Sequence, residues 1–555
     1  MSALSHRRSS RRLLAAAISM LLTLPSVGPA WAQASPTCAF VLGFATLHGL
    51  IPSVVGGCVD NEQHNPSNGD ALQHSAGGLL VWRKADNFTA FTDGSHSWVN
   101  GPNGVQERLN SQRFAWEANP EGLPVISPQP SSGADWPTYH HDQSRRGLAS
   151  NTPPLSSVQS LWQSPGLDGQ IYAEPLAVGS DIFVATENDS VYALDAGTGN
   201  VVWRSHLGSP VPAASLPCGD VDPVGITGTP VIDPGKGVLY AAAFVQPGQD
   251  LLFALDVTSG ATLWQRSIDP SGADPAVQNQ RGALALANGM VYVPFGGRDG
   301  DCGAYHGWVV GVPAGGSGAL RAYRVPTVGG GGRSNGGGGI WAPAGVAADS
   351  SGNLFVATGN GGSVTFDYSD SVLKLSPSLQ VSGYFAPSNW QALSLADLDL
   401  GSEAPVLLDN GLVFVVGKAG VGYLLRASSL GQIGGEAFSA RVCSGGAFGA
   451  SAYASPYLYV PCTGGVVALR VDSSGPSFSV AWSSPRFRAG SPIVAGGALW
   501  DLSRDGELYG LDPGNGQAHA QVSVGASATS FPSLAAAGGR LFVPAGTRVV
   551  AFVGS

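Results

Sequence analysis

The sequence has few charged residues and no cluster of basic ones. Asp, Glu, Lys and Arg make up 12% of the 555 residues, and the formal net charge is −10. Four of the arginines fall within the first twelve residues, and no stripe of Lys or Arg follows them. Nucleic acids and anionic membranes are bound through such cations, so neither is expected as a partner.

Long hydrophobic runs are also missing, except near the start of the chain. Residues 13–24 form an apolar run that follows the arginines and precedes small-residue cleavage options at 30–32 and 32–34. The run is too short to cross a bilayer comfortably, so residues 1–34 are predicted to be a cleaved export signal, with no transmembrane segment in the mature chain. Residues 10–14 also resemble the twin-arginine export pattern. We therefore expect a secreted or periplasmic protein.

No CxxC spacing occurs, which removes the usual zinc and haem-attachment patterns. All six cysteines lie beyond the signal, and an even number in an exported chain favours disulfides. Six cysteines allow 15 arrangements. The preferred pairing is Cys38–Cys58, Cys218–Cys302 and Cys443–Cys462.

What the sequence does contain is one short apolar phrase repeated eight times. Each copy has a large apolar residue, an aromatic or apolar one, and usually Val-Ala or Val-Pro. A second apolar run follows each copy after a polar or Gly-rich turn, which predicts one hairpin per repeat. The copies begin at Ile182, Leu239, Val291, Leu354, Val413, Leu458, Leu499 and Leu541.

The clearest repeats continue into an outer strand that carries Trp, as from Asp195 to Trp203, so a repeat has about four strands. A period of about 40–60 residues with four strands indicates propeller blades. The chain ends after the third strand of its last copy, while an unpaired Leu161-Trp162 strand precedes the first. We predict an all-β, eight-bladed β-propeller of four-stranded antiparallel blades, closed by this N-terminal strand, with seven blades as the nearest alternative.

The residues before the propeller do not share the repeated phrase. Residues 35–126 are predicted to form a small, β-rich, disulfide-containing module, residues 127–135 a linker, and residues 136–555 the propeller.

The repeats Ala-Leu-Asp-x-x-[Thr/Ser]-Gly-x-x-x-Trp and the opening Trp-Pro-Thr-Tyr-His-His-Asp at 136–142 resemble the pyrroloquinoline quinone (PQQ) propeller superfamily, which includes quinoprotein alcohol dehydrogenases. By motif, the resemblance implies that Trp341 stacks under PQQ and that Asn360 is a calcium ligand. It also implies that Asp397 and Asp399 form the catalytic Asp-x-Asp segment and that Lys418 contacts the quinone oxygens.

That set of residues is chemically coherent. A flat aromatic face holds a planar cofactor, and a hard cation with oxygen ligands polarises a quinone carbonyl. A carboxylate can take the alcohol proton while the cofactor accepts hydride, and Lys stabilises the developing negative charge.

The sequence also departs from the pattern that this resemblance implies. Ala396 stands where a Trp precedes the catalytic Asp, and Trp390-Gln391 offers an alternative alignment with Gln at the base position. Residues 243–245, Ala-Phe-Val, occupy the place of a calcium-binding Glu, and no vicinal cysteine pair or CxxCH is present. An enzyme of this kind would need an external electron acceptor.

Two functions therefore compete. The favoured one is a noncatalytic scaffold that needs no cofactor and presents its propeller face to a small molecule, polymer or protein. The alternative is a PQQ- and calcium-dependent alcohol or sugar dehydrogenase. Convergence of Trp341, Asn360, Asp397 and Lys418 on one pocket would support the enzyme.

Overall fold

The computed structural model describes residues 38–554, apart from positions 67, 95, 102–103, 111–112, 115–116, 118–124, 127–134, 151, 156 and 328–336. The predicted export signal and nearly all of the predicted linker lie outside the described residues. The chain divides into two compact units, Met1–Ser97 and Trp98–Ser555, and each is described by itself.

The first unit combines two short helices with antiparallel strands. They are α1 (Leu42–Leu50), α2 (Pro52–Val55), β1 (Gln63–His64), β2 (Ala71–Ser75), β3 (Gly78–Arg83) and β4 (Phe88–Thr92), with the strands paired in chain order. Leu47, Leu80 and Phe91 form its buried interior, and the Cys38–Cys58 disulfide closes its start. Four short strands follow along the chain: β5 (His96–Gly101), β6 (Gly104–Leu109), β7 (Arg113–Phe114) and β8 (Val125–Ile126).

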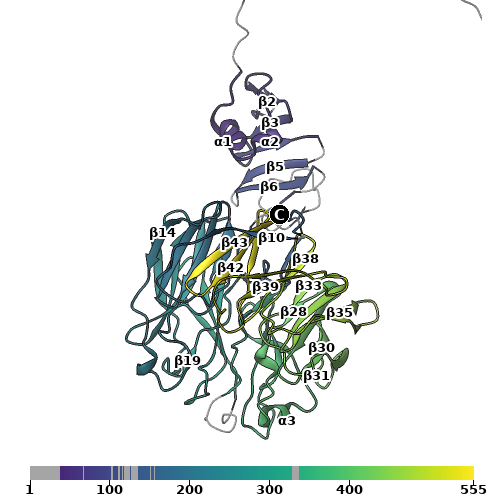
Figure 1. The fold of residues 1–555 in the computed structure, drawn as a ribbon. Helices are drawn as coiled ribbons and strands as arrows, with labels where there is room; N and C mark the ends of the chain where they lie inside the picture. Colours follow the sequence, from purple (N-terminus) through teal and green to yellow (C-terminus); the bar gives the residue numbers. More distant parts are fainter. Residues whose placement is uncertain are drawn as a thin grey trace, which may run out of the picture. The chain divides into compact units, whose positions relative to one another are not determined.

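The second unit contains, among its described residues, eight sheets of four or five strands (Figure 1). The first three comprise β11 (Leu176–Val178), β12 (Asp181–Thr186), β13 (Ser190–Asp195) and β14 (Val201–His206); β15 (Val231–Asp233), β16 (Val238–Val245), β17 (Gln249–Asp256) and β18 (Thr262–Ser267); and β19 (Gln278–Asn279), β20 (Ala285–Ala287), β21 (Met290–Gly297), β22 (Trp308–Pro313) and β23 (Arg321–Arg324).

The next three sheets comprise β24 (Ala347–Ala348), β25 (Leu354–Ala357), β26 (Val372–Leu375), β27 (Val381–Ala386) and β31 (Gln432–Ile433); β28 (Val406–Leu407), β29 (Leu412–Val416), β30 (Val421–Arg426) and β32 (Phe438–Arg441); and β33 (Ala452–Ala454), β34 (Tyr457–Cys462), β35 (Gly465–Asp472) and β36 (Ser477–Ser483). The last two comprise β37 (Ile493–Ala495), β38 (Ala498–Leu502), β39 (Glu507–Leu511), β40 (Ala518–Ser523) and β9 (Leu148–Ala149); and β41 (Ala535–Ala537), β42 (Arg540–Ala545), β43 (Arg548–Gly554) and β10 (Val158–Gln163).

The repeated phrase forms one strand in each of these sheets, namely β12, β16, β21, β25, β29, β34, β38 and β42. Every residue of β21 and β29 is buried, whereas the outer strands β14 and β40 alternate between exposed and half-buried positions. A strand that is covered on both faces reads as a continuous apolar run, and an outer strand does not. The sequence pattern thus distinguishes the inner strands from the outer one.

The Trp on an outer strand packs against a turn glycine of another sheet. Trp162 lies against Gly199, Trp203 against Gly260, Trp264 against Gly316, and Trp482 against Gly516. Each of these glycines has a positive φ, and a Cβ there would meet the indole ring. This contact explains why Gly and Trp recur together in the repeats.

Residues 136–149, here called the connector segment, join the first strands of seven sheets. The backbone of Trp136 exchanges two hydrogen bonds with Ala177 in β11. Backbone hydrogen bonds also link Pro137 to Ile232, Gln143 to Ala348, Ser144 to Leu407, Arg146 to Tyr453 and Gly147 to Val494, while Arg145 donates side-chain hydrogen bonds to Leu284 and Val346. The segment therefore ties together sheets that are far apart in the sequence.

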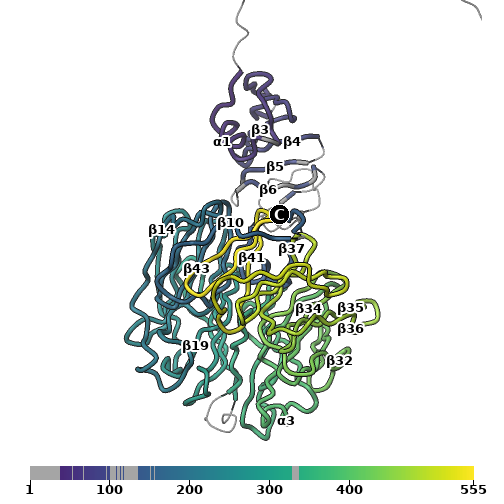
Figure 2. Tube along the Cα trace, in the orientation of Figure 1, coloured from purple at the N-terminus to yellow at the C-terminus, as the bar shows by residue number. Residues whose placement is uncertain are grey.

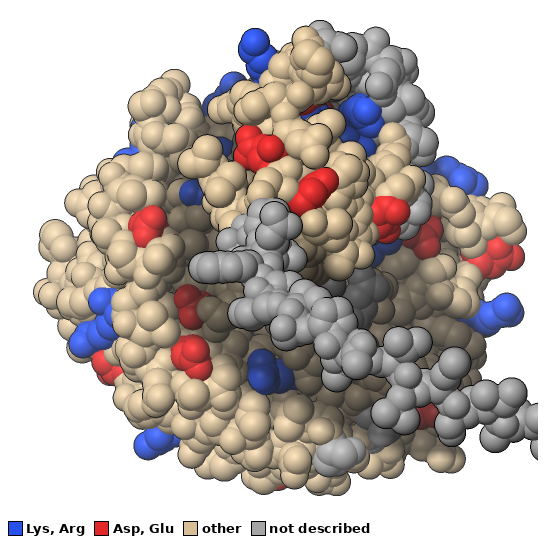
Figure 3. Space-filling model, turned by 90° about the horizontal axis from the view of Figure 1, so that it is seen from above, with Lys and Arg blue, Asp and Glu red and all other residues tan. Residues whose placement is uncertain are grey.

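Strand β10 pairs with β43, so the chain's last strand lies beside one of the earliest of this unit (Figure 1). Figure 2 follows the intervening chain from the teal strands through α3 (Trp390–Leu395) to the yellow C-terminal strands. On the face shown in Figure 3, acidic and basic side chains are interspersed. No helix among the described residues is long and apolar enough to span a membrane.

Candidate functional site

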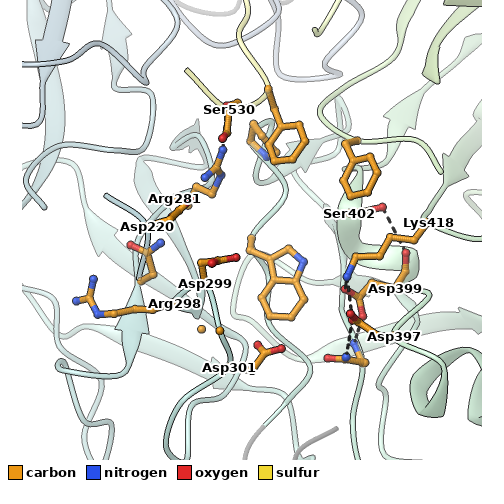
Figure 4. Close-up of a pocket in the computed structure, with 18 of the residues that line it drawn as sticks. Asp220, Arg281, Arg298, Asp299, Asp301, Asp397, Asp399, Ser402, Lys418 and Ser530 are labelled. Atoms are coloured by element: carbon orange, nitrogen blue, oxygen red, sulfur yellow. Dashed lines mark hydrogen bonds and ion pairs between the residues drawn. The ribbon is translucent and has the colours of Figure 1, made fainter. Parts of the chain in front are cut away.

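The five predicted site residues line one cavity of about 720 Å³ (Figure 4). Trp341 precedes β24, Asn360 follows β25, the two aspartates lie between α3 and β28, and Lys418 follows β29. The sequence motifs are thus brought together by loops of neighbouring repeats. The rest of the lining includes Asp220, Asn279, Arg281, Arg298, Asp299, Asp301, Ser394, Leu395, Ser402, Phe448, Arg504, Ser530 and Phe531.

The half-buried Trp341 is held by three glycines. A Cβ at Gly359 would lie 2.8 Å from Cη2 and 2.9 Å from Cε2 of its indole, and a Cβ at Gly296 or Gly339 would also collide with Trp341. Tyr305 packs at a tilt, with the ring centroids 5.9 Å apart. The bare glycine backbone therefore fixes the position of the indole at the wall of the cavity.

Asn360 connects the Trp341 side of the pocket to the aspartates. Its backbone N–H donates to Asp399 Oδ1 at 3.0 Å, and its Nδ2 donates to Asp397 Oδ1 at 3.1 Å. Its Oδ1 is buried and has no hydrogen-bond partner. A buried amide oxygen without a donor is unusual in a folded protein and is suited to a bound cation.

Lys418 forms ion pairs with both aspartates. Its Nζ lies 2.8 Å from Asp397 Oδ1 and 2.6 Å from Asp399 Oδ2, and its backbone N–H donates to the Asp399 carbonyl. Burial acts to lower the pKa of Lys418, but Asp399 and Asp397 outweigh it and raise the pKa above its ordinary value. Lys418 therefore carries a fixed positive charge in the pocket.

The two aspartates differ sharply in exposure. The Asp397 side chain is 68% exposed, whereas that of Asp399 is 2% exposed. Burial raises the pKa of Asp399, and Lys418 opposes this shift. Asp397 is therefore the carboxylate available to a ligand, and Asp399 anchors Lys418 and the Asn360 backbone.

Several pocket residues were not identified from the sequence. Asp299 and Asp301 lie just before Cys302, whose disulfide with Cys218 was predicted. Two acidic residues next to a predicted disulfide were a signal in the sequence that could have marked them as candidate site residues. Burial raises the pKa of Asp301, while a hydrogen bond from Tyr305 opposes that shift.

Arg281, Arg504 and Phe531 also went unidentified, because they lie in loops of different repeats and belong to no motif. Figure 4 places Arg281 across the cavity from Lys418.

The expected departures from the PQQ pattern have structural counterparts. Ala243, Phe244 and Val245 are buried in β16. Gln391 lies in α3 and is not part of the pocket lining, so the alternative alignment does not place a side chain in the cavity.

The preferred disulfide pairing is confirmed by bonds between Cys38 and Cys58, Cys218 and Cys302, and Cys443 and Cys462. In the part of the chain that the structure describes, no three His, Cys, Asp or Glu residues are grouped to hold a metal ion.

Residues 156–322 match the PQQ_2 family model, described as outer membrane protein assembly factor BamB. A BamB of Burkholderia pseudomallei (strain K96243) is 33% identical over 119 residues, which are 21% of this chain and 30% of that protein. A polyvinylalcohol dehydrogenase of Sphingopyxis sp. (strain 113P3) is 27% identical over 198 residues, 33% of this chain and 27% of that protein. The matches thus span less than a third of either relative.

The fold is similar to that of the quinohemoprotein alcohol dehydrogenase ADHIIG from Pseudomonas putida HK5. The TM-score is 0.60 at 14% identity, covering 76% of this chain and 81% of that one. At this identity the likeness concerns the fold alone.

Proposed function

Since this chain is a PQQ-like β-propeller protein, we propose that its pocket is the catalytic site of an extracytoplasmic dehydrogenase that oxidises alcohols with PQQ and Ca²⁺. The observation that carries this proposal is the convergence of Trp341, Asn360, Asp397, Asp399 and Lys418 on one cavity. It reverses the preference drawn from the sequence, where the same residues had no known spatial relation.

The side chains present fit such a cofactor. The Trp341 indole offers a flat surface, and Lys418 offers a fixed cation. The unpartnered Asn360 Oδ1 would supply an oxygen ligand for Ca²⁺. With no cluster of three acidic side chains among the described residues, the remaining ligands would come from PQQ itself and water. When bound, PQQ supplies the two-electron acceptor for the alcohol.

Asp397 has the exposure that a base requires. Its Oδ1 is engaged by Asn360 and Lys418, while no described residue donates to its Oδ2. Oδ2 can therefore accept the proton of a substrate hydroxyl. Lys418 holds the carboxylate in place and stabilises negative charge that forms nearby.

Three features of the whole chain belong to the same proposal. The eight sheets form a closed eight-bladed ring, in which β10 completes the last blade. Residues 35–126 form a separate module, residues 127–135 a linker, and residues 1–34 a cleaved export signal. The three disulfides support a location outside the cytoplasm.

The test is calorimetric titration of the purified chain with PQQ, with and without Ca²⁺, followed by a dye-linked assay with alcohols. We expect one Ca²⁺-dependent site. Affinity should fall about tenfold or more in Trp341→Ala and Lys418→Gln. Lys236→Gln is the matched control, because Lys236 pairs with Asp233 on the exposed surface. Absence of PQQ binding both with and without Ca²⁺ would rule out this proposal.

A noncatalytic scaffold is the second candidate function. It is favoured by the match of residues 156–322 to the BamB family and by the lack of a carboxylate at the Ala243 position of β16. If PQQ does not bind, the propeller face would be tested for a small-molecule, polymer or protein partner.

A further inference from the structure

The lining of the pocket also includes two arginines that lie against one aromatic ring. The guanidinium carbons of Arg281 and Arg504 lie 5.2 and 5.1 Å from the centroid of the Phe531 ring. Phe448 stacks on the same ring at 5.3 Å, with an interplanar angle of 8°. Cation–π attraction holds each guanidinium against the ring, and its remaining N–H groups can donate to a ligand.

These two cations are not neutralised by the protein around them. Arg281 donates to the Ser530 carbonyl, and neither arginine has a carboxylate within ion-pairing distance among the described residues. Burial lowers the pKa of both. Repulsion from Arg488 and then from Arg281 lowers the pKa of Arg504 further, while Asp220 opposes the shift at both arginines and Asp505 opposes it at Arg504. Holding two partly buried like charges together costs free energy, which an anionic ligand would recover.

We propose that Arg281 and Arg504 form a carboxylate-binding subsite in this pocket, supported on Phe531 and Phe448. A guanidinium fork matches a carboxylate geometrically, and the aromatic pair favours a carboxylate that is carried on a flat ring. The subsite does not depend on the proposed dehydrogenase activity, because its residues are separate from Asp397 and Lys418. Its ligand is the carboxylate of a second molecule that binds in the same pocket, such as the substrate.

The experiment compares two probes of the same shape on the chain without added cofactor. Benzoate and uncharged benzamide are titrated by calorimetry into the wild-type protein and its variants. We expect benzoate to bind in preference to benzamide. Arg504→Gln and Arg281→Gln should each weaken benzoate binding by about tenfold or more, since a charge-assisted hydrogen bond is lost. Arg504→Lys should give an intermediate loss, because it keeps the charge and loses the fork.

Arg488→Gln is the matched control. Arg488 pairs with Asp505 at 3.2 Å with both side chains exposed, and its backbone carbonyl accepts a hydrogen bond from the Arg504 N–H. It therefore removes the same charge close to the same place, and it measures how far a purely electrostatic change at Arg504 weakens binding. Equal affinity for benzoate and benzamide, or equal weakening by Arg504→Gln and Arg488→Gln, would overturn the proposal.

Addition of PQQ with Ca²⁺ tests whether the arginines hold the cofactor instead. If PQQ displaces benzoate and Arg504→Gln weakens PQQ binding, the carboxylate belongs to the cofactor and the proposal is overturned. If benzoate binds beside PQQ, or binds although PQQ does not, the subsite serves a second molecule. A failure of the dehydrogenase proposal is thus visible separately, as absent PQQ binding with benzoate binding retained.

Discussion

Substitution of Gly359 by Ala tests how the pocket holds Trp341. The added Cβ would lie within 3.0 Å of three indole atoms, closer than real Cβ atoms approach their neighbours. The obstruction is a rigid ring, so the indole or the Gly359 backbone must move. Overpacking of this kind costs about 1–3 kcal/mol of folding free energy. Trp341 is only half-buried and can tilt toward the cavity, so we expect about 1–2 kcal/mol.

A double-mutant cycle makes that number specific to the Trp341 contact. In the background of Trp341→Ala the new methyl group meets no indole, so most of the cost of Gly359→Ala should disappear. The coupling energy should therefore be about −1 to −2 kcal/mol. Urea unfolding of the four proteins, followed by circular dichroism, gives the free energies, and Gly315→Ala is the control because its Cβ would meet nothing within 4 Å.

The binding readout should change with the stability readout. A displaced indole presents a different surface to the cavity, so Gly359→Ala should weaken PQQ binding and alter the tryptophan emission of the folded protein. Additive free energies in the cycle, or a Gly359→Ala protein as stable as Gly315→Ala, would show that the indole does not rest on this glycine.

Three further predictions follow from burial and cross-linking. Asp397→Asn should abolish alcohol oxidation while changing the unfolding free energy by less than about 0.5 kcal/mol, because Asp397 is exposed. Asp399→Asn should also destabilise the fold, because Asp399 is buried and paired with Lys418. Equal losses of stability in the two variants would contradict a ligand-facing role for Asp397 and an anchoring role for Asp399. Burial raises the pKa of Asp501 to about 7. Between pH of about 4 and 7 the folded state therefore holds a proton that the unfolded state has lost, and the unfolding free energy should fall as the pH rises through this range. Asp501→Asn should flatten this part of the profile in urea titrations, and an unchanged slope would refute it. Cys218→Ser should cost about 4–5 kcal/mol, because the bond to Cys302 closes a separation of 84 residues; a Tm matching the wild type would contradict this estimate.

The sequence predicted the strands best where both faces are buried. The phrase that starts at Ile182 lies within β12, and the one that starts at Val413 lies within β29, because a covered strand needs an unbroken apolar run. Trp341, Asn360 and Lys418 were located by motif, and the structure brings them together. Their chemical roles stay predictions.

Other features could not be read from the chain. The α1 helix is apolar almost throughout, so its sequence lacks the helical period that would separate it from a strand. The α3 helix is only six residues long, too short for any period to show. The contact between Arg281 and Phe531 joins two loops that are far apart in the sequence, and no local preference encodes such a pair.

The pairing of β10 with β43 has a consequence for how the protein is made. The ribosome produces the first of these strands hundreds of residues before its partner, and at about 5–20 residues per second the delay is on the order of 20–80 s. During that interval the edge of β10 is open, and the connector segment gains its neighbours one sheet at a time. A nascent chain in this state exposes apolar strand edges that can pair with other chains. A premature stop anywhere before Arg548 therefore leaves β10 without its partner, however complete the other sheets are.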